Sequence, residues 1–257
     1  MQIKTSHIST AFSVVWKGQN MKYQNLFTPY RIGSVEIRNR FAMAPMGPLG
    51  LGDSEGGWNQ RGIDYYTRRA QGGTGLIITG VTFSDCEVEK PSFPNCPNST
   101  YNPVQFVRTS REMTERVHAY GSKIFLQMSA GFGRVTIPTN LGEFPPVAPS
   151  AIPHRWLDKI CRPLTVEEIH GIVKSFGDGA FNAKRAGFDG VEIHAVHEGY
   201  LMDQFAISKF NQRTDEYGGS LENRLRFARE VVKEIKRRCG EDFPVALRFS
   251  PKSMMKD

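Results

Sequence analysis

Five short apolar runs, separated by longer amphipathic stretches, constrain the fold of this chain more than any other feature. The apolar residues are nearly continuous within each run, which is typical of strands covered on both faces in a parallel sheet. The runs lie at residues 40–46, 75–80, 122–128, 189–194 and 243–249. Helical patterns fill the intervals, at residues 59–71, 103–120, 165–186 and 220–239. This alternation predicts βαβ units and the α/β class.

Two architectures fit the alternation, a doubly wound sheet and a (β/α)8 TIM barrel. A doubly wound dinucleotide-binding sheet should carry Gly-x-Gly-x-x-Gly after a strand. The nearest candidate, residues 47–57, lacks that spacing, and we therefore favour the barrel. Because a closed barrel needs eight strands, the five runs predict an incomplete barrel with strands 1 to about 5, in a fragment or a truncated reading frame.

The partial barrel is expected to occupy residues 21–257, since patterned sequence begins at Met21. Residues 1–20 are expected to be a disordered or spurious N-terminal extension. Residues 31–38 alternate apolar and polar side chains around Gly33-Ser34, which predicts a hairpin with a two-residue turn. We expect this hairpin to plug the N-terminal mouth of the barrel. The Pro-rich residues 136–163 show no periodicity and are typical of a lid or flexible cover.

Composition narrows the class of protein. The formal net charge is +7, but the Lys and Arg residues are mostly dispersed. The sequence has no basic stripe interleaved with aromatic residues, so we do not expect nucleic-acid binding. The sequence has no run of about 18 apolar residues, so we do not expect a membrane span. The four cysteines form no Cys-x-x-Cys pair and no zinc-finger spacing, so we expect free thiols, Cys86 and Cys96 among them, in a reduced, cytoplasmic setting. The sequence leaves homo-oligomerisation open.

The fourth apolar run carries the strongest sign of chemistry. It stops at His194, and His197 and Tyr200 follow at once. Three groups that donate or transfer protons therefore lie where a strand meets a loop, which is the catalytic end of α/β barrels. The order His-x-x-His-Glu differs from the helical His-Glu-x-x-His of zinc enzymes, so we expect no metal. We interpret the trio as catalytic.

Several motifs in the chain resemble the Old Yellow Enzyme family of FMN-dependent oxidoreductases. They are Asn39-Arg-Phe-Ala-Met-Ala-Pro-Met46, Gly72-Gly-x-Gly-Leu-Ile-Ile-Thr-Gly80, Gly187-Phe-Asp-Gly-Val-Glu-Ile-His194 and Asn211-Gln-Arg-Thr-Asp-Glu-Tyr-Gly-Gly-Ser-Leu-Glu-Asn-Arg224. The resemblance covers residues 22–257 and is strongest to the bacterial 2-enoate reductase and NADH:flavin oxidoreductase group. It implies a barrel that holds FMN at the C-terminal ends of its strands, with NAD(P)H as electron donor and a small unsaturated carbonyl or carboxylate compound as substrate.

The resemblance also implies a set of FMN-binding residues. They are Ala44, Pro45, Met46, Gly80, Gln127 and Arg248. The chemistry of the side chains agrees: an amide is donor and acceptor, as the pyrimidine edge of a flavin requires, and a cation stabilises the charge of reduced flavin. Glycine allows close backbone approach. A 4Fe-4S cluster and FAD are expected only in a C-terminal part that this chain lacks.

The chain departs from the family pattern at two positions. Gly47 stands where the family often has Thr, Ser or Cys beside the flavin. Glu198 is inserted before Gly199-Tyr200, which leaves open whether His197 or Tyr200 faces the substrate.

Three functions remain. The first is an ene-reductase acting on an enoate or enone, with His194 and His197 binding the substrate oxygen and Tyr200 as proton donor. The second is a flavin NADH oxidase or amine dehydrogenase on the same scaffold. The third is an inactive partial barrel that binds no flavin.

Other residues have structural interpretations. We expect Glu192 to form a salt bridge, and Asp215 and Arg224 to form an ion-pair and capping framework after the fourth strand. Trp58 and Tyr66 fit substrate contact and packing equally well.

Overall fold

The computed structural model describes residues 23–47, 49–84, 88–89, 95–137, 141, 145–195 and 200–250. The N-terminal extension at residues 1–20 and the side chains of His197, Glu198 and Cys86 lie outside these residues.

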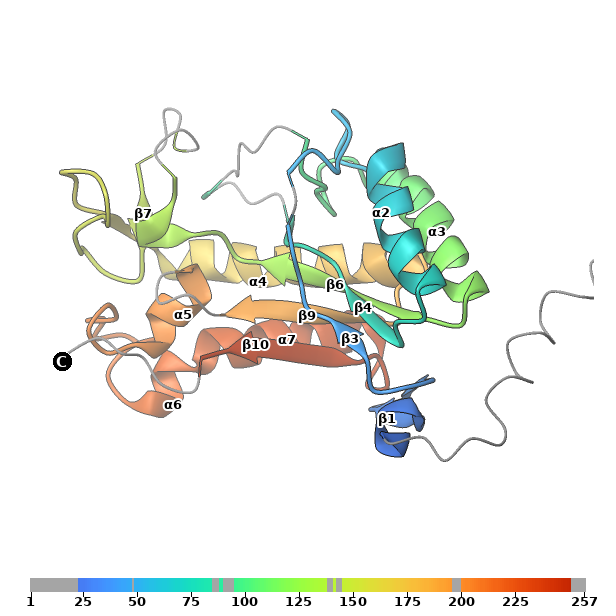
Figure 1. Cartoon of the computed structure of the whole chain (residues 1–257). Coiled ribbons are helices and arrows are strands. Elements are labelled where there is room, and N and C mark those ends of the chain that lie inside the picture. The colour runs from blue at the N-terminus through green and yellow to red at the C-terminus, as the bar shows by residue number, and fades with distance from the viewer. Residues whose placement is uncertain are drawn as a thin grey trace, which may run out of the picture.

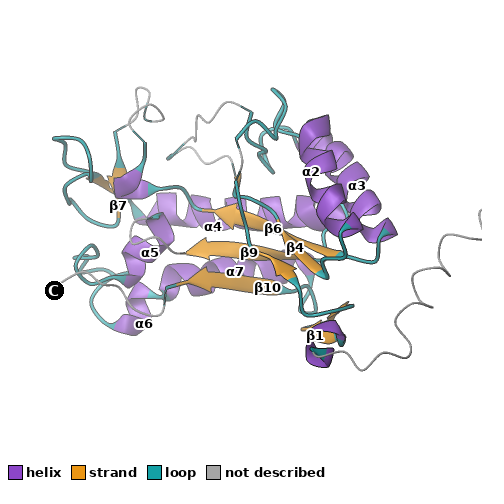
Figure 2. Ribbon diagram, in the orientation of Figure 1, coloured by secondary structure: helices purple, strands orange, loops and turns teal. Residues whose placement is uncertain are grey.

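A parallel sheet forms the centre of the described structure (Figures 1 and 2). Its strands follow the chain in order from one edge to the other, and all of their pairings are parallel. They are β3 (Ala42–Met43), β4 (Leu76–Ile78), β6 (Lys123–Ser129), β9 (Gly190–Ala195) and β10 (Val245–Phe249), with β5 (Thr82–Phe83) paired to the end of β6. All five predicted runs therefore contain strands, and the sheet is the predicted partial barrel.

Helices cover one face of this sheet. Figure 1 shows α4 (Val166–Arg185) and α7 (Arg226–Cys239) behind the strands, with α2 (Gln60–Gln71) and α3 (Pro103–Ala119) beside each other at one end. Alternate strand residues such as Leu126, Val191 and Ile193 join the helices in the main apolar core. The predicted capping box opens α4: the Thr165 hydroxyl accepts from the Glu168 amide, and the Glu168 carboxylate accepts from the Thr165 amide.

The predicted hairpin closes the opposite face at the N-terminal ends of the strands. Strands β1 (Tyr30–Ile32) and β2 (Val35–Ile37) pair antiparallel across a turn in which Gly33 has a φ of 57°. Ile37 packs against Leu76 and Phe125, near the starts of β4 and β6. The Ser34 hydroxyl donates to the Asp242 carbonyl at 2.6 Å, just before β10.

Smaller elements lie at the two ends of the sheet. They are the 3-10 helices η1 (Gln24–Phe27) and η2 (Gly133–Val135), the short strands β7 (Val147–Ala148) and β8 (Arg162–Pro163), and the short helices α5 (Leu201–Ala206) and α6 (Leu221–Arg224). Figure 1 shows β7, α5 and α6 at the end toward which the strands run. The Pro-rich residues thus contain a small parallel β7–β8 pair.

Three elements differ from the sequence-based prediction. The first strand, β3, has only two residues, since Pro45 lacks an amide to continue the pairing. The second predicted run, residues 75–80, contains β4, and the additional short strand β5 follows it after Gly80. The helix expected at residues 220–239 breaks at Leu225 into α6 and α7. The side chains on either side of the break are anchored separately, Arg224 to the Ala206 carbonyl and Arg226 to the Glu216 carbonyl.

Candidate active site

A row of polar side chains lies on the face of the sheet opposite the helices. Gln127 of β6 is in register with Glu192 of β9, and His194 of β9 is in register with Arg248 of β10. Their strand neighbours Leu126, Val191 and Ile193 point to the helices, so these four residues point to the other face. On the same face, one pleat nearer the N-terminal end, Phe125 is covered by the hairpin. The polar row therefore lies at the C-terminal half of the strands, where barrel enzymes act.

Gln127 and Glu192 form a buried hydrogen-bonded pair. The Gln127 side chain is 2 % exposed, and its amide nitrogen donates to the Glu192 carboxylate at 2.8 Å. Burial raises the pKa of Glu192, while the Gln127 hydrogen bond and the positive charge of Arg248 act against this rise. The expected structural role of Glu192 thus takes the form of a hydrogen bond to a predicted cofactor ligand, with Arg248 as its nearby cation.

His194 and Tyr200 meet at the end of β9. Their rings are 4.7 Å apart between centroids and nearly perpendicular, at 87°. His194 is buried near the C-terminal end of β9, and Tyr200 is the N-cap residue of α5. Burial raises the pKa of Tyr200, so its hydroxyl stays protonated at neutral pH.

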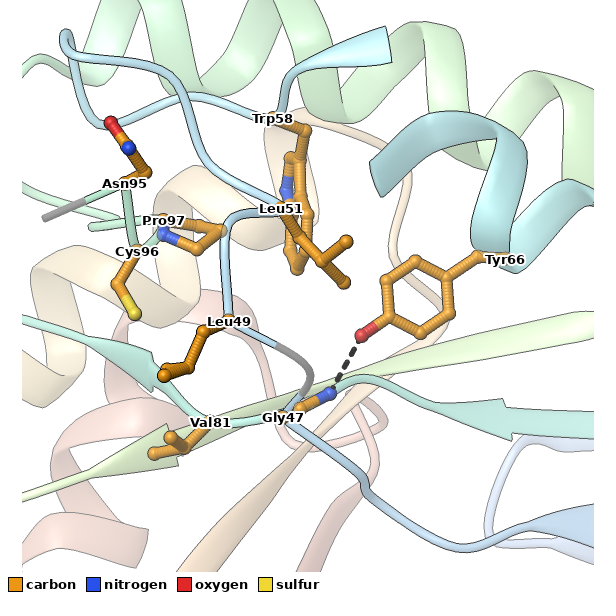
Figure 3. A pocket seen from close by; sticks show the side chains of 10 residues that line it. Gly47, Leu49, Leu51, Trp58, Tyr66, Val81, Asn95, Cys96 and Pro97 are labelled. Carbon is orange, nitrogen blue, oxygen red and sulfur yellow. Dashed lines mark hydrogen bonds between the residues drawn. The ribbon is translucent and has the colours of Figure 1, made fainter. Parts of the chain in front are cut away.

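The predicted residues on the first two strands form a neighbouring corner. Ala44 and Met46 are exposed after β3 and Pro45 is half-buried. At Gly80 a Cβ atom would collide with the Met46 carbonyl, so glycine is required here by the crossing of the two chain segments. The Gly80 amide donates to the buried Tyr66 hydroxyl at 2.8 Å (Figure 3).

A cavity of about 50 Å³ adjoins this corner (Figure 3). Its lining is mainly apolar and comprises Gly47, Leu49, Leu51, Trp58, Tyr66, Gly80, Val81, Asn95, Cys96 and Pro97. Trp58 is 3 % exposed and its indole nitrogen donates to the Ser110 hydroxyl, and Tyr66 is fully buried. Packing therefore accounts for both aromatic residues, and Tyr66 also anchors Gly80.

The motif at residues 211–224 forms a framework after β9 that contacts α5. The sequence predicted such a framework for Asp215 and Arg224, but the bonding partners in the structure are different. Asp215 pairs with Arg213 at 2.6 Å and accepts from the Tyr217 amide. Arg224 donates to the carbonyls of Ala206 and Gly219. Asn211 donates to the carbonyls of Phe205 and Tyr217. Besides the Arg213–Asp215 ion pair, the framework consists of side chains bound to backbone carbonyls at the end of α5 and in the loop after it, which ion-pair reasoning from the sequence missed.

Two further buried polar residues were not singled out by the sequence. Glu89 accepts hydrogen bonds from the loop that follows β6, and Gln204 of α5 contacts the same loop. The only local signal was the Gly131-Phe-Gly133 pair of glycines in that loop, because nothing in the sequence tells which distant side chain a loop will bind.

Within the described residues, no group of three or more His, Cys, Asp or Glu side chains could hold a metal ion. No helix in the same part of the chain is long and apolar enough to cross a membrane.

The donor set on the polar row fits FMN. After its bond to Glu192, the Gln127 amide still offers an oxygen acceptor and a second N–H, which suits an imide edge. Arg248 of β10 offers a cation two strands away from Gln127, on the far side of β9. At the adjoining corner Gly47 carries no side chain, and Ala44 and Met46 are exposed.

Comparison with known proteins agrees with this geometry. The pattern of the NADH:flavin oxidoreductase / NADH oxidase family matches residues 25–257. A cinnamate reductase from Clostridium sporogenes is 63% identical over 237 residues, which are 92% of this chain and 36% of that protein. An NADH oxidase from Thermoanaerobacter brockii is 42% identical over 229 residues, 89% of this chain and 34% of that protein.

A solved structure shares the fold. The Old Yellow Enzyme from Pichia sp. AKU4542 superposes with a TM-score of 0.78 at 34% identity, over 89% of this chain and 60% of that one. The chain thus spans about a third of the length of the two curated relatives. With its family pattern, its half-barrel sheet and its polar row, the chain belongs to the NADH:flavin oxidoreductase / NADH oxidase family and has the Old Yellow Enzyme fold.

Proposed function

We propose that the protein carrying this chain binds FMN and reduces the activated C=C bond of an enoate, with NAD(P)H as electron donor. The observation that carries the proposal is the His194–Tyr200 ring pair at the end of β9, beside Gln127 and Arg248. The 63% identity to a cinnamate reductase favours an arylacrylate such as cinnamate as the substrate.

Each part of the site has a role in this reaction. Bound FMN, once reduced by NAD(P)H, would supply the hydride that reaches the β-carbon of the substrate. His194 donates a hydrogen bond to the substrate carboxylate or carbonyl oxygen and stabilises the negative charge that develops there. His197, which lies outside the described residues, is the proposed second donor. Tyr200 gives its proton to the α-carbon, so that hydride and proton together saturate the double bond.

The same donor set supports a set of proposed cofactor contacts. Gln127 would hydrogen-bond the pyrimidine edge, and Arg248 would balance negative charge on the reduced ring. Ala44, Pro45, Met46 and Gly80 would line the ring with backbone atoms. We propose these contacts from the donor set and the resemblance of the motifs.

Tyr200→Phe tests the proposal when the two half-reactions are measured separately in the FMN-loaded protein. We expect reduction of FMN by NAD(P)H to be unchanged and alkene reduction to slow by about 10²–10⁴, because a positioned general acid is lost. Tyr120→Phe, at an exposed position after α3, is the matched control and should change neither step. If Tyr200→Phe leaves alkene reduction unchanged, the donor is another group, with His197 next to test. A slowing of FMN reduction alone would refute the proposed orientation of the site.

NADH oxidase activity is the second candidate, favoured by the 42% identity to the Thermoanaerobacter brockii protein of that name. The two candidates differ in the electron acceptor. Under air without enoate, an oxidase consumes O2 at the full rate of NADH oxidation, and adding cinnamate does not increase that rate. An ene-reductase oxidises NADH faster when cinnamate is added under argon. Purified protein without flavin absorbance would contradict both candidates.

A further inference from the structure

Glu89 carries a buried carboxylate that the proposed chemistry does not use. The residue is 8 % exposed, and its carboxylate accepts hydrogen bonds from described residues of one loop. The Phe132 amide donates at 2.7 Å, the Gly133 amide at 2.9 Å and the Thr136 hydroxyl at 2.8 Å. All three donors belong to the loop that follows β6. Burial raises the pKa of Glu89, and these donors act against the rise.

The backbone of this loop is shaped around the carboxylate. Consecutive amides that converge on one anion form a nest, here filled by a side chain of the same chain. Gly131 has a φ of 106°, and a Cβ atom on it would lie 2.8 Å from a Glu89 oxygen. Glycine is therefore required where the carboxylate sits against the loop.

Helix α5 binds the other side of the same loop. The Gln204 amide nitrogen donates to the Phe132 carbonyl at 3.0 Å, and its oxygen accepts from the Arg134 amide at 3.2 Å. The Leu201 amide donates to the Gly131 carbonyl at 3.2 Å. Phe132 is thus held through its amide by Glu89 and through its carbonyl by Gln204.

The ring of Phe132 connects the loop that Glu89 and Gln204 hold to the candidate proton donor, Tyr200. It lies 4.6 Å from the Tyr200 ring, centroid to centroid, and the Tyr200 ring lies 4.7 Å from that of His194. Tyr200 also immediately precedes α5, so the loop positions it by a side-chain contact and by its helix.

We propose that Glu89 is a positioning residue that holds Tyr200 in place by binding the loop at residues 131–136. The carboxylate fixes the Phe132 backbone, and Phe132 and α5 then set the Tyr200 ring against His194. The role in catalysis rests on the proposed function of Tyr200 as proton donor. The mechanical link between Glu89 and Tyr200 does not.

The first test is amide hydrogen exchange on the chain without FMN, comparing Glu89→Ala and Glu89→Gln with the unmodified chain. We expect faster exchange at residues 131–136 and 201–206 in Glu89→Ala, with β6 and β9 unchanged. Glu89→Gln keeps one acceptor oxygen and loses the other, so its rates should be intermediate. Glu112→Ala, at an exposed position on α3, is the matched control. Unchanged exchange at residues 201–206 in Glu89→Ala would overturn the link.

The second test measures the half-reactions in the FMN-loaded protein. We expect Glu89→Ala to slow alkene reduction by about 10-fold to 100-fold, since misplacement of a reacting group by about 1 Å costs up to that much. FMN reduction and substrate KM should stay unchanged, which a general loss of folding would not produce. Glu89→Gln should restore part of the rate.

If Glu89→Ala fails to fold, Thr136→Val removes one of the three donors at similar volume and should give a smaller effect in the same direction. No effect of Thr136→Val on exchange or rate would then overturn the proposal. If Tyr200→Phe proves harmless while exchange still spreads from Glu89 to α5, the assignment of the donor fails and the positioning link stands.

Discussion

Single residues on the inner face of the sheet gain their roles from strand register. The sequence identified Gln127, His194 and Arg248 separately. The parallel pairing of β6, β9 and β10 brings them together in the polar row. The sequence analysis gave Glu192 only a structural role. Its carboxylate accepts a hydrogen bond from the Gln127 amide at 2.8 Å, and the positive charge of Arg248 acts on its pKa. A carboxylate at this place orients the amide, because an ionised carboxylate only accepts.

The Arg248 cation gives the clearest test at this scale. We expect Arg248→Ala to weaken FMN binding and to lower the reduction potential of the bound flavin, because the reduced ring loses its balancing charge and Glu192 loses its neighbouring cation. Both quantities are measured by titration of the apoprotein and by equilibrium reduction with a reference dye. Arg248→Lys should retain part of the effect. Arg229→Ala, at an exposed ion pair on α7, is the control. An unchanged potential in Arg248→Ala would remove Arg248 from the flavin site.

At the scale of elements, the sequence predicted what has a local signal. Continuous apolar runs located the strands, the Thr165–Glu168 capping box located the start of α4, and Gly33-Ser34 located the hairpin turn. The break at Leu225, the short strand β5 beyond Gly80 and the binding of a loop by Glu89 were missed. Each depends on a group from elsewhere in the chain: the Ala206 and Glu216 carbonyls that bind Arg224 and Arg226, the end of β6 that pairs with β5, and the loop amides that bind Glu89. Such contacts exist only once the fold has formed.

Asp189 links three elements through one carboxylate. It binds the His118 ring at 2.7 Å, the Ile124 amide at 2.9 Å and the Lys123 ammonium at 3.0 Å, joining the end of α3 to the starts of β6 and β9. Burial raises the pKa of Asp189, but these partners outweigh it, and the pKa lies below its usual range. A lowered folded-state pKa stabilises the fold at pH values above the unfolded pKa of about 3.9, and this stabilisation is lost as pH falls through the folded pKa.

Asp189→Asn should therefore destabilise the fold in a pH-dependent manner. We expect its free energy of unfolding to be lower by about 1–3 kcal/mol at pH 7, from hydrogen bonds that lose their charged acceptor. The difference from the unmodified chain should shrink as pH falls below about 4, where both chains approach a neutral side chain. Urea unfolding at a series of pH values measures this. Asp64→Asn, in an exposed pair with Arg116, should have little effect. A difference that is constant with pH would contradict the role of the charge.

At the scale of the whole molecule, the sheet has two free edges among the described residues, at β3 and β10. Leu247 and Phe249 of β10 are in register with Ile193 and Ala195 of β9, and so point to the same side. The β9 side chains are buried under helices, whereas Leu247 is 47% and Phe249 is 61% exposed. Met46, beyond the opposite edge, is 59% exposed. Apolar side chains next to unpaired strand amides are a template for association.

The chain alone should therefore self-associate through the β10 edge. We expect sedimentation velocity to show dimers or larger species whose fraction rises with protein concentration. Leu247→Lys should shift the distribution toward the monomer, because a charge on an edge strand opposes pairing with another chain. Val104→Lys offers a matched control, since Val104 is 79% exposed on α3, far from β10 in the chain, and should leave the distribution unchanged. A monomer that persists at high concentration would show that the exposed residues of β10 do not suffice to drive association. Equal shifts from both lysine variants would show that association depends on net charge and not on this edge.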